Sequence, residues 1–294
     1  MKEPVFCGAC TAIITPFTHD GIDFARLKQQ IDFQAENHTA AIVIAGTTGE
    51  NATLESHEFE KLVAFCVRSV GGRMKCIVGI GGNNTAECMN KAEFAAAAGA
   101  DAVLMTTPYY NKTTQQGLIE HFSSIADRSE LPMILYNVPS RTSIGIGFDV
   151  YLALSKHPKI NGVKEASGDF AMIARLSAEC EDLNLWSGND DQTVPMMALG
   201  AKGVISVASN LIPAEIAELC DLCITGSYAE AREKYRRYAP LCRMLFAETN
   251  PIPIKAAMEM AGTDSGRLRL PLVPMTAGNR FALRREMERL GLPC

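Results

Sequence analysis

The sequence predicts a closed (β/α)8 barrel followed by a C-terminal helical extension. Short β-rich segments alternate with amphipathic helical segments eight times along the 294 residues. The β-rich segments are mostly continuous apolar runs, which is typical of strands that are covered on both faces. The sequence lacks a Gly-rich dinucleotide-binding loop, which favours a closed barrel over an open sheet.

The elements follow one another in a regular order. Strands are expected at residues 9–15, 41–45, 76–80, 102–106, 133–137, 160–164, 185–187 and 203–207. Helices are expected at residues 24–36, 56–70, 85–98, 115–128, 148–156, 170–180, 193–199 and 213–222. From about Tyr228 onward the pattern indicates three further helices, separated near Asn250-Pro251 and residues 262–274. No low-complexity linker divides the chain, so we expect one domain, with the barrel at 1–226 and the extension at 227–294.

Composition restricts the classes of function. Hydrophobic residues make up 47% of the chain and aromatic residues only 7%, which predicts an extensive aliphatic core. A net charge of −5 argues against a nucleic-acid partner. The first residues lack the pattern of a signal peptide, and no apolar run is long enough to span a bilayer. We therefore expect a cytoplasmic protein without a membrane partner.

Two pairs among the ten cysteines have the spacing of redox or zinc sites, Cys7 with Cys10 and Cys220 with Cys223. The pairs are far apart in the sequence, and no set of histidines lies near them. Buried cysteine behaves as a small apolar residue. Reduced structural thiols are therefore the default expectation, and the sequence predicts no metal site.

Lys164 is the most informative single residue. It lies near the end of the apolar run Ile160-Asn-Gly-Val-Lys-Glu165, which is predicted to be a buried strand. A deprotonated lysine amine is a nucleophile that forms a Schiff base with a keto substrate. The alternative is a strand-end lysine that is paired with Glu165.

In a barrel of this kind, catalytic side chains gather where strands end and the following loops begin. Glycines at 46 and 49 permit a tight turn that can aim the amides of Thr47 and Thr48 at a carboxylate, although a plain turn would look the same. Tyr136 can relay protons, with Thr48 and Tyr110 completing a hydrogen-bonded chain, or it can be an ordinary core residue. Arg141 suits bidentate binding of a second carboxylate, or it is a solvated surface residue.

These motifs resemble those of the dihydrodipicolinate synthase family, within the pyruvate-dependent aldolases that include N-acetylneuraminate lyase. The matching segments are Gly46-Thr-Thr-Gly-Glu50, Thr107-Pro-Tyr-Tyr-Asn111, Tyr136-Asn-Val-Pro-Ser-Arg-Thr142, Val163-Lys-Glu-Ala-Ser-Gly168, Gly203-Val-Ile-Ser206, Asn250-Pro-Ile-Pro-Ile-Lys255 and Leu268-Arg-Leu-Pro271. The resemblance covers essentially the whole chain. Arg141 in its Pro-Ser-Arg-Thr setting is the most specific feature, because related aldolases that take sugar acids lack it there.

The resemblance implies a lyase of diaminopimelate and lysine biosynthesis that uses no metal or organic cofactor. Lys164 would condense with pyruvate, while Tyr136, Thr48 and Tyr110 relay protons. The resulting enamine would attack aspartate semialdehyde, whose carboxylate Arg141 would hold. Further substrate contacts are implied at Thr47, Thr48, Gly188 and Ile205. The family also implies a homotetramer built from two dimers, in which Tyr110 enters the neighbouring subunit's site.

Lysine-inhibited members carry a regulatory pocket, whose positions by resemblance would be Asn51, Ala52, Ser56, Phe59, Asn83, Glu87 and Tyr109. Ser56 and Phe59 stand where several inhibited enzymes have histidines, and His57 is displaced by one residue. We therefore expect weaker inhibition by lysine. Two rival functions remain open: an aldolase acting on N-acetylneuraminate or a 2-keto-3-deoxy sugar acid, and a catalytically silent barrel that responds to pyruvate.

Overall fold

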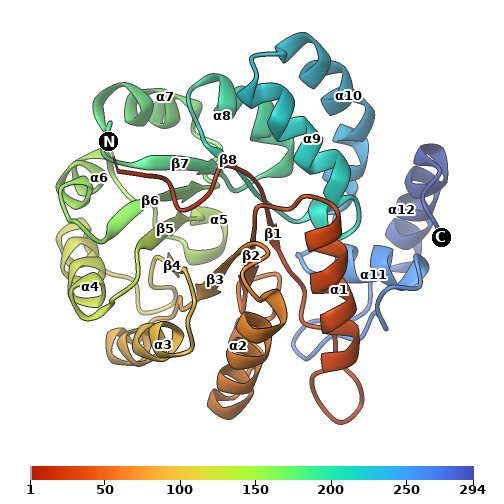
Figure 1. The fold of residues 1–294 in the computed structure, drawn as a ribbon, viewed down its shortest axis with the longest axis horizontal. Helices are drawn as coiled ribbons and strands as arrows, with labels where there is room; N and C mark the ends of the chain where they lie inside the picture. The colour runs from red at the N-terminus through yellow and green to blue at the C-terminus, as the bar shows by residue number, and fades with distance from the viewer. Residues whose placement is uncertain (1) are drawn as a thin grey trace.

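A computed structural model describes residues 2–294 and contains a closed barrel of eight parallel strands in sequence order (Figure 1). The first strand pairs with the second and with the eighth, which closes the barrel. The strands are β1 (Gly8–Ala12), β2 (Ala41–Ile44), β3 (Lys75–Gly79), β4 (Ala102–Thr106), β5 (Met133–Asn137), β6 (Ile160–Glu165), β7 (Asn184–Ser187) and β8 (Gly203–Ser206). The predicted fold class is confirmed.

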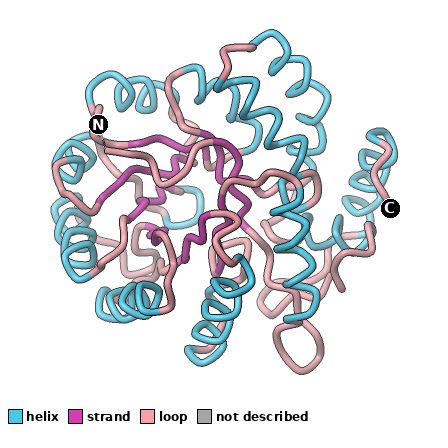
Figure 2. The backbone as a smooth tube through the Cα atoms, viewed as in Figure 1, coloured by secondary structure: helices cyan, strands magenta, loops and turns pink. Residues whose placement is uncertain are grey.

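Helices surround the strands on the outside of the barrel (Figure 2). They are α1 (Phe24–Glu36), α2 (Ser56–Val70), α3 (Thr85–Ala97), α4 (Gln115–Arg128), α5 (Pro139–Thr142), α6 (Phe148–Ser155), α7 (Phe170–Glu179), α8 (Thr193–Ala198), α9 (Pro213–Ile224), α10 (Tyr228–Met244), α11 (Ile252–Met260) and α12 (Ala277–Leu290). Single 3₁₀ turns lie at η1 (Asn51–Thr53), η2 (Asp190–Gln192) and η3 (Ala208–Asn210). Within residues 2–294, no helix is both long and apolar enough to cross a membrane.

The strands are buried along almost their whole length, as their continuous apolar sequences predicted. The clearest difference from the predicted bounds is in β1, which ends at Ala12 rather than at residue 15. Beyond it, the Ile14 amide donates to Asn210 Oδ1 (3.1 Å), and Thr15 Oγ1 donates to the Gly49 carbonyl (2.7 Å). The chain leaves the sheet there because side chains and a loop satisfy its polar groups.

One end of the barrel is closed by packed side chains. The ring of Phe6 stacks on Trp186 with a centroid separation of 5.0 Å, and Trp186 Nε1 donates to the Phe6 carbonyl (3.2 Å). The segment before β1 crosses this end of the strands (Figure 1). It is fixed by Lys2 Nζ, which donates to the carbonyl oxygens of Ser155 and Ile160 among others. A site inside the barrel must therefore open at the carboxyl ends of the strands.

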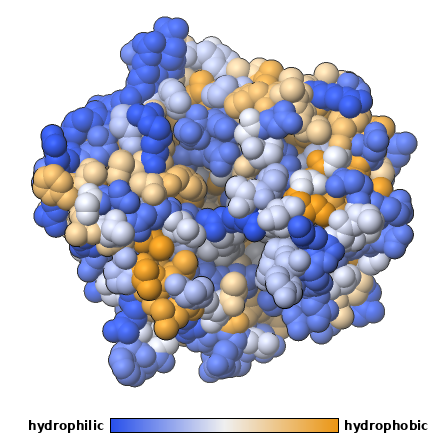
Figure 3. Space-filling view, turned by 180° about the vertical axis from the view of Figure 1, so that it is seen from behind, coloured by the Kyte–Doolittle hydropathy of each residue, from blue (hydrophilic) through white to orange (hydrophobic). Residues whose placement is uncertain are grey.

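The C-terminal extension packs on one side of the barrel. Helix α10 lies against α9 and α12, and α11 lies against α12. The loop before α11 and the segment after it reach the carboxyl ends of the strands. The face opposite to that in Figure 1 is mainly hydrophilic, with separate apolar patches (Figure 3).

Candidate active site

A cavity of about 660 Å³ opens at the carboxyl ends of the strands. This is the end at which barrels of this type carry their active sites. Strands β1, β2, β4, β5 and β6 each contribute a side chain, and the C-terminal extension contributes a further wall. The lining residues are Ala12, Val43, Gly46, Thr47, Thr48, Leu104, Tyr136, Val138, Ser140, Arg141, Lys164, Ala166, Gly188, Asn189, Val207, Phe246, Ala247, Glu248, Thr249 and Asn250.

Lys164 and Tyr136 lie together in the inner part of this cavity. They are register partners on β6 and β5, so their side chains emerge on the same face. The Lys164 side chain is 5% exposed, and its Nζ lies 4.3 Å from the centroid of the Tyr136 ring. The predicted proximity of a lysine nucleophile and a tyrosine is therefore present in the geometry.

Glu165 is not the partner of Lys164, so the alternative of a strand-end ion pair between them was wrong. Adjacent residues of a strand point to opposite faces. The Glu165 carboxylate points outward, where it accepts hydrogen bonds from Asn137 Nδ2 (3.0 Å), the Tyr151 hydroxyl (2.8 Å) and the Ser167 amide (2.7 Å). Burial, followed by the charge of Glu165, raises the pKa of Tyr151 well above its ordinary value, so its hydroxyl remains a donor.

A glycine at position 188 leaves room for the Lys164 side chain. A Cβ at this position would lie 2.7 Å from Ala166 Cβ and 3.2 Å from Lys164 Cε. Any larger residue would therefore press on the side chain that is proposed to react. Gly188 lines the cavity and leaves this space free, and its predicted contact with substrate stays a prediction.

The turn after β2 carries Thr47 and Thr48 into the cavity. Glu50 closes this turn with a positive φ of 56°, and its amide donates to the Thr47 carbonyl (3.1 Å). A Cβ on Gly49 would lie 3.2–3.3 Å from Thr15 Oγ1, the Ala45 nitrogen and the Ile13 carbonyl. The turn is therefore packed tightly against the end of β1, which explains the glycine.

Arg141 lies on the short helix α5, which the sequence analysis did not predict. Pro139 occupies the first turn of this helix, where a missing N–H costs nothing. The Arg141 side chain is exposed, lines the cavity, and donates from Nη2 to the Asn250 carbonyl (3.0 Å). Its guanidinium is thus held beside the cavity rather than free in solvent.

Two predicted site residues, Tyr110 and Ile205, do not line the cavity of their own chain. Tyr110 is 92% exposed with a positive φ of 69°, and it is not among the residues that line the cavity. It therefore does not join Tyr136 and Thr48 within one chain. Ile205 is fully buried on β8 inside the barrel, while its neighbour Val207 lines the cavity. The substrate contact at Ile205 stays a prediction.

The seven positions of the expected regulatory pocket do not line one cavity. Asn51, Ala52 and Tyr109 line a second cavity of about 340 Å³, which shares Thr47, Tyr136, Arg141 and Asn250 with the first. Asn83 lines a separate cavity of about 400 Å³. Ser56 and Glu87 are exposed in the first turns of α2 and α3, and Phe59 is buried in the core. A single chain does not bring all seven positions together.

Asn250 is the functional-site residue that the sequence analysis missed. It lies just before α11, is 5% exposed, and lines both cavities. Its Nδ2 donates to Thr48 Oγ1 (2.9 Å), while its carbonyl accepts from Arg141. In the sequence, Asn250 marked a boundary between helices and began a segment that resembles the family, but neither observation predicted its contact with the barrel.

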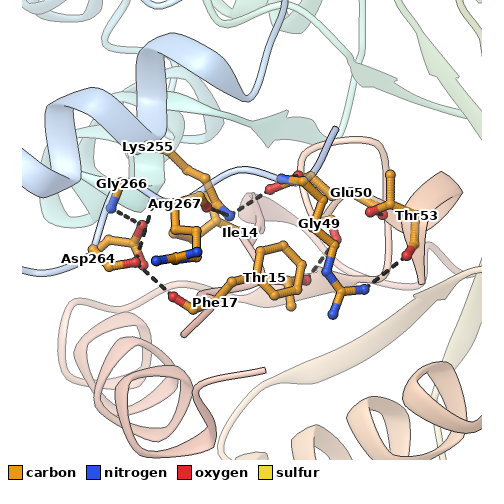
Figure 4. Close-up of polar contacts among 12 residues, drawn as sticks. Ile14, Thr15, Phe17, Gly49, Glu50, Thr53, Lys255, Asp264, Gly266 and Arg267 are labelled. Atoms are coloured by element: carbon orange, nitrogen blue, oxygen red, sulfur yellow. Dashed lines mark hydrogen bonds and ion pairs between the residues drawn. The ribbon is translucent and has the colours of Figure 1, made fainter. Parts of the chain in front are cut away.

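A buried ion pair fixes the turn after β2 to the extension (Figure 4). Lys255 Nζ on α11 donates to Glu50 Oε1 (2.6 Å) and to the Arg267 carbonyl (2.7 Å), and it lies 4.3 Å from the Phe17 ring centroid. Both charged side chains are at most 1% exposed. Burial lowers the pKa of Lys255, and the charge of Glu50 opposes this shift.

The cysteines lie apart from this cavity, and none of them lines it. Eight of the ten are buried, with Cys7 and Cys294 exposed, and all ten are free. In residues 2–294 no three or more His, Cys, Asp or Glu side chains form a group that could hold a metal ion.

Known proteins resemble this chain over nearly its whole length. Residues 5–290 match the Dihydrodipicolinate synthetase family. A 4-hydroxy-tetrahydrodipicolinate synthase of a Thermoanaerobacter species is 46% identical over 291 residues, covering 98% of each chain. The crystal structure of dihydrodipicolinate synthase from Aquifex aeolicus superposes with a TM-score of 0.96 at 42% identity, covering 98% of this chain and 99% of that one.

A third relative bears on regulation. The crystal structure of the enzyme from Cyanidioschyzon merolae with lysine bound has a TM-score of 0.95 and 38% identity, and it covers 99% of this chain and all of that one. Together these matches confirm the resemblance that the lysine, tyrosine and arginine motifs indicated. The chain belongs to the dihydrodipicolinate synthetase family.

Proposed function

We propose that this chain condenses pyruvate with L-aspartate 4-semialdehyde to form 4-hydroxy-tetrahydrodipicolinate. The observation that carries the proposal is the buried Lys164 amine, which faces Tyr136 in a cavity whose rim holds Arg141. The full-length relatives that bear this enzyme's name support the same reaction. The reaction requires one amine nucleophile and sites for two carboxylates; Lys164 would be the nucleophile, and the turn after β2 and Arg141 would bind the carboxylates.

The first half-reaction would take place on Lys164. Its neutral amine attacks the carbonyl carbon of pyruvate, and loss of water leaves an imine. The main-chain amides of Thr47 and Thr48 would bind the pyruvate carboxylate. Removal of a proton from C3 then gives the enamine, with Tyr136 and Thr48 carrying the proton.

The second half-reaction would join the substrates. The enamine C3 attacks the aldehyde carbon of the semialdehyde, which forms the new carbon–carbon bond. Arg141 binds the carboxylate of this second substrate. The substrate's own amino group then attacks the imine carbon and displaces the Lys164 amine. This closes the ring and returns the enzyme to its starting state.

Trapping with borohydride tests the proposal directly. Incubation with pyruvate and borohydride should leave a reduced adduct on Lys164, which peptide mass spectrometry locates. Lys164→Arg keeps the charge but should form no adduct and lose nearly all turnover, because a guanidinium does not form the imine. An adduct on Lys255, the other buried lysine of this region, would refute the assignment. A wild-type enzyme without turnover on pyruvate and aspartate semialdehyde would refute the function.

The proposal extends to assembly and regulation. The 92% exposed ring of Tyr110 supports a homotetramer of two dimers in which Tyr110 completes the neighbouring subunit's relay, because exposed tyrosines are enriched at interfaces. Inhibition by lysine should be weaker than in relatives with a complete pocket, because Phe59 is buried and Ser56 is short. A lysine titration at fixed substrate tests this, and full inhibition at low micromolar lysine would contradict it.

A further inference from the structure

We infer that Asn250 is a positioning residue that sets the direction of the Thr48 hydroxyl in the proton relay; the inference rests on the proposed function. Asn250 belongs to the C-terminal extension, and its side chain is 95% buried at the edge of the cavity. Its Nδ2 donates to Thr48 Oγ1 over 2.9 Å. The extension thereby contributes a hydrogen-bond donor to the centre of the barrel site.

The chemistry of a hydroxyl explains why this donor matters. A threonine hydroxyl has one proton to give and two positions at which it accepts. The Asn250 amide occupies one accepting position, so the other accepting position and the proton are left for the relay. A relay hydroxyl needs this pair, because it must receive a proton on one side and release one on the other. Without Asn250 the hydroxyl would be free to turn.

The Asn250 amide oxygen supports a specific purpose for this side chain. Oδ1 is buried and accepts no hydrogen bond from any residue in 2–294. Leaving a buried carbonyl oxygen unpaired costs free energy, and such groups in native structures require an explanation. Gln30 also has a buried, unpaired amide oxygen, but Asn250 differs from it because Asn250 lines the cavity and donates to a cavity residue. Here only the N–H that faces Thr48 is used.

Both ends of this hydrogen bond are anchored by the same ion pair. Glu50 lies two residues after Thr48, and it accepts from Lys255, five residues after Asn250. The buried pair holds the turn and the start of α11 against each other. The Asn250–Thr48 contact is therefore built on two segments that do not move independently.

Asn250 also holds Arg141, but through a different group. Arg141 Nη2 donates to the main-chain carbonyl of Asn250, whereas Thr48 is bound by the side-chain amide. Replacing the side chain should therefore disturb proton transfer and leave the clamp for the second substrate in place. This separation distinguishes positioning from a general loss of structure.

The experiment follows exchange of the pyruvate C3 protons in D2O by NMR, with no second substrate present. Asn250→Ala should slow enzyme-catalysed exchange by about 30-fold, a part of what general acid–base catalysis contributes. Borohydride trapping on Lys164 should remain. The KM for aspartate semialdehyde should change by less than about twofold, because the Arg141 contact uses the main chain.

A near-isosteric variant and a matched control accompany this measurement. Asn250→Asp keeps the shape but cannot donate to Thr48, so it should lose exchange to a similar extent even if the alanine variant folds poorly. Gln30→Ala is the control, since Gln30 is likewise a buried amide that joins the barrel to the extension, donating to the Thr263 carbonyl (3.3 Å) with its own Oε1 unpaired. Gln30 does not line the cavity, and its variant should exchange at the wild-type rate.

Other results of these experiments would contradict either the inference or the proposed function. Wild-type exchange by either folded Asn250 variant would overturn the inference. A parallel rise in the KM for the semialdehyde would also overturn it, because the residue would then be structural. Thr48→Val combined with Asn250→Ala should exchange no more slowly than Thr48→Val alone, and additive losses would contradict action through Thr48. A wild-type enzyme that forms no imine and exchanges no protons would instead refute the proposed function.

Discussion

The geometry at the base of the cavity depends on three residues: Lys164, Tyr136 and Gly188. The lysine and the tyrosine lie side by side because β5 and β6 pair in a register that places them opposite each other. The glycine leaves the space through which the lysine side chain extends. The chemistry therefore depends on one hydrogen-bond register and one missing side chain, in addition to the reactive groups.

Arg141 gives a prediction at this scale. Arg141→Ala should raise the KM for aspartate semialdehyde and lower kcat/KM by about 100-fold, because a charge-assisted clamp on the second substrate is lost. Imine formation with pyruvate should continue, since the proposed site of the first substrate is at Lys164 and the turn after β2. Steady-state kinetics with both substrates and borohydride trapping with pyruvate alone provide the two readings. An equal loss in both would mean that Arg141 is structural.

Some of the site was predictable from residue identity and some was not. The structure brings five predicted residues to one cavity, all with polar or charged side chains and all in or just after the last residues of a strand: Thr47, Thr48, Tyr136, Arg141 and Lys164. Asn250 carries no such signal, because an amide before a proline is also typical of an ordinary turn. Its contact with Thr48 spans 202 positions of sequence, which no local pattern encodes.

At the scale of elements, ion pairs join α11 and the segment after it to the turn following β2 and to α2. Lys255 of α11 binds Glu50, and Arg269 forms a second ion pair with Glu58 on α2. The amide of Arg269 also donates to Glu50 Oε2 (3.0 Å). These contacts hold the extension at the opening of the barrel, where the loop before α11 lines the cavity.

Removing Lys255 should destabilise the protein markedly. Lys255→Met leaves the Glu50 carboxylate buried without its cation, for which we expect a loss of about 3–5 kcal/mol in the free energy of unfolding. The double variant Glu50→Gln/Lys255→Met should recover part of this loss, because no charge then remains buried. Urea denaturation followed by circular dichroism measures both. A single variant within about 1 kcal/mol of wild type would show that the pair contributes little.

The pair of Glu58 and Arg269 predicts a dependence on pH. The hydrogen bond that Arg269 donates to the Glu58 carboxylate lowers the pKa of Glu58 from 4.5 to about 2. A carboxyl group with a depressed pKa in the folded state stabilises the protein above its unfolded pKa, and this contribution is lost as the pH falls through the folded value. The stabilisation by Glu58 should therefore be complete above pH 4.5 and disappear toward pH 2.

Thermal unfolding between pH 6 and pH 2 tests this. The difference in Tm between wild type and Glu58→Gln should be largest near pH 6 and shrink across the window from 4.5 to 2. Glu60→Gln, at an exposed position of the same helix, is the control and should show no such trend. A difference that stays constant with pH would contradict the assignment.

Element bounds were predicted best where the apolar pattern is clear, and the four-residue helix α5 was not predicted. Strands β4 and β5 and helices α1, α2 and α4 have the predicted bounds, because their apolar pattern decides them. Helix α5 has only four residues, too few to show a helical period. Its position depends on packing at the strand end, which sequence periodicity does not report.

At the scale of the whole molecule, the exposed Tyr110 predicts a shared active site. Mixing inactive Tyr110→Phe protein with inactive Lys164→Ala protein under subunit exchange should restore some activity. Restored sites would combine an intact Lys164 from one chain with an intact Tyr110 from the other. Activity assays before and after exchange, with exchange verified by native mass spectrometry, measure this. No recovery after proven exchange, or a fully active monomer, would refute it.

The whole-molecule fold was the most predictable level, because eight repeats of one pattern leave few topologies. The assembly was not predictable in this way, since a surface patch does not specify its partner. The sequence shows adjacent tyrosines after β4, but only the structure shows that Tyr109 is 38% exposed and Tyr110 is 92% exposed. That difference identifies which of the two rings is available to another subunit.

The packing of Phe6 on Trp186 determines how substrates reach the active site. Because these side chains close the barrel at the amino ends of the strands, the cavity opens only at the carboxyl ends. Both substrates must enter and the product must leave through this opening. In the proposed reaction, pyruvate would bind at Lys164 in the inner part of the cavity, so it would have to enter before the semialdehyde binds at Arg141. Steady-state kinetics should therefore show that pyruvate binds before the semialdehyde. Excess semialdehyde should inhibit the enzyme, and a higher pyruvate concentration should relieve this inhibition.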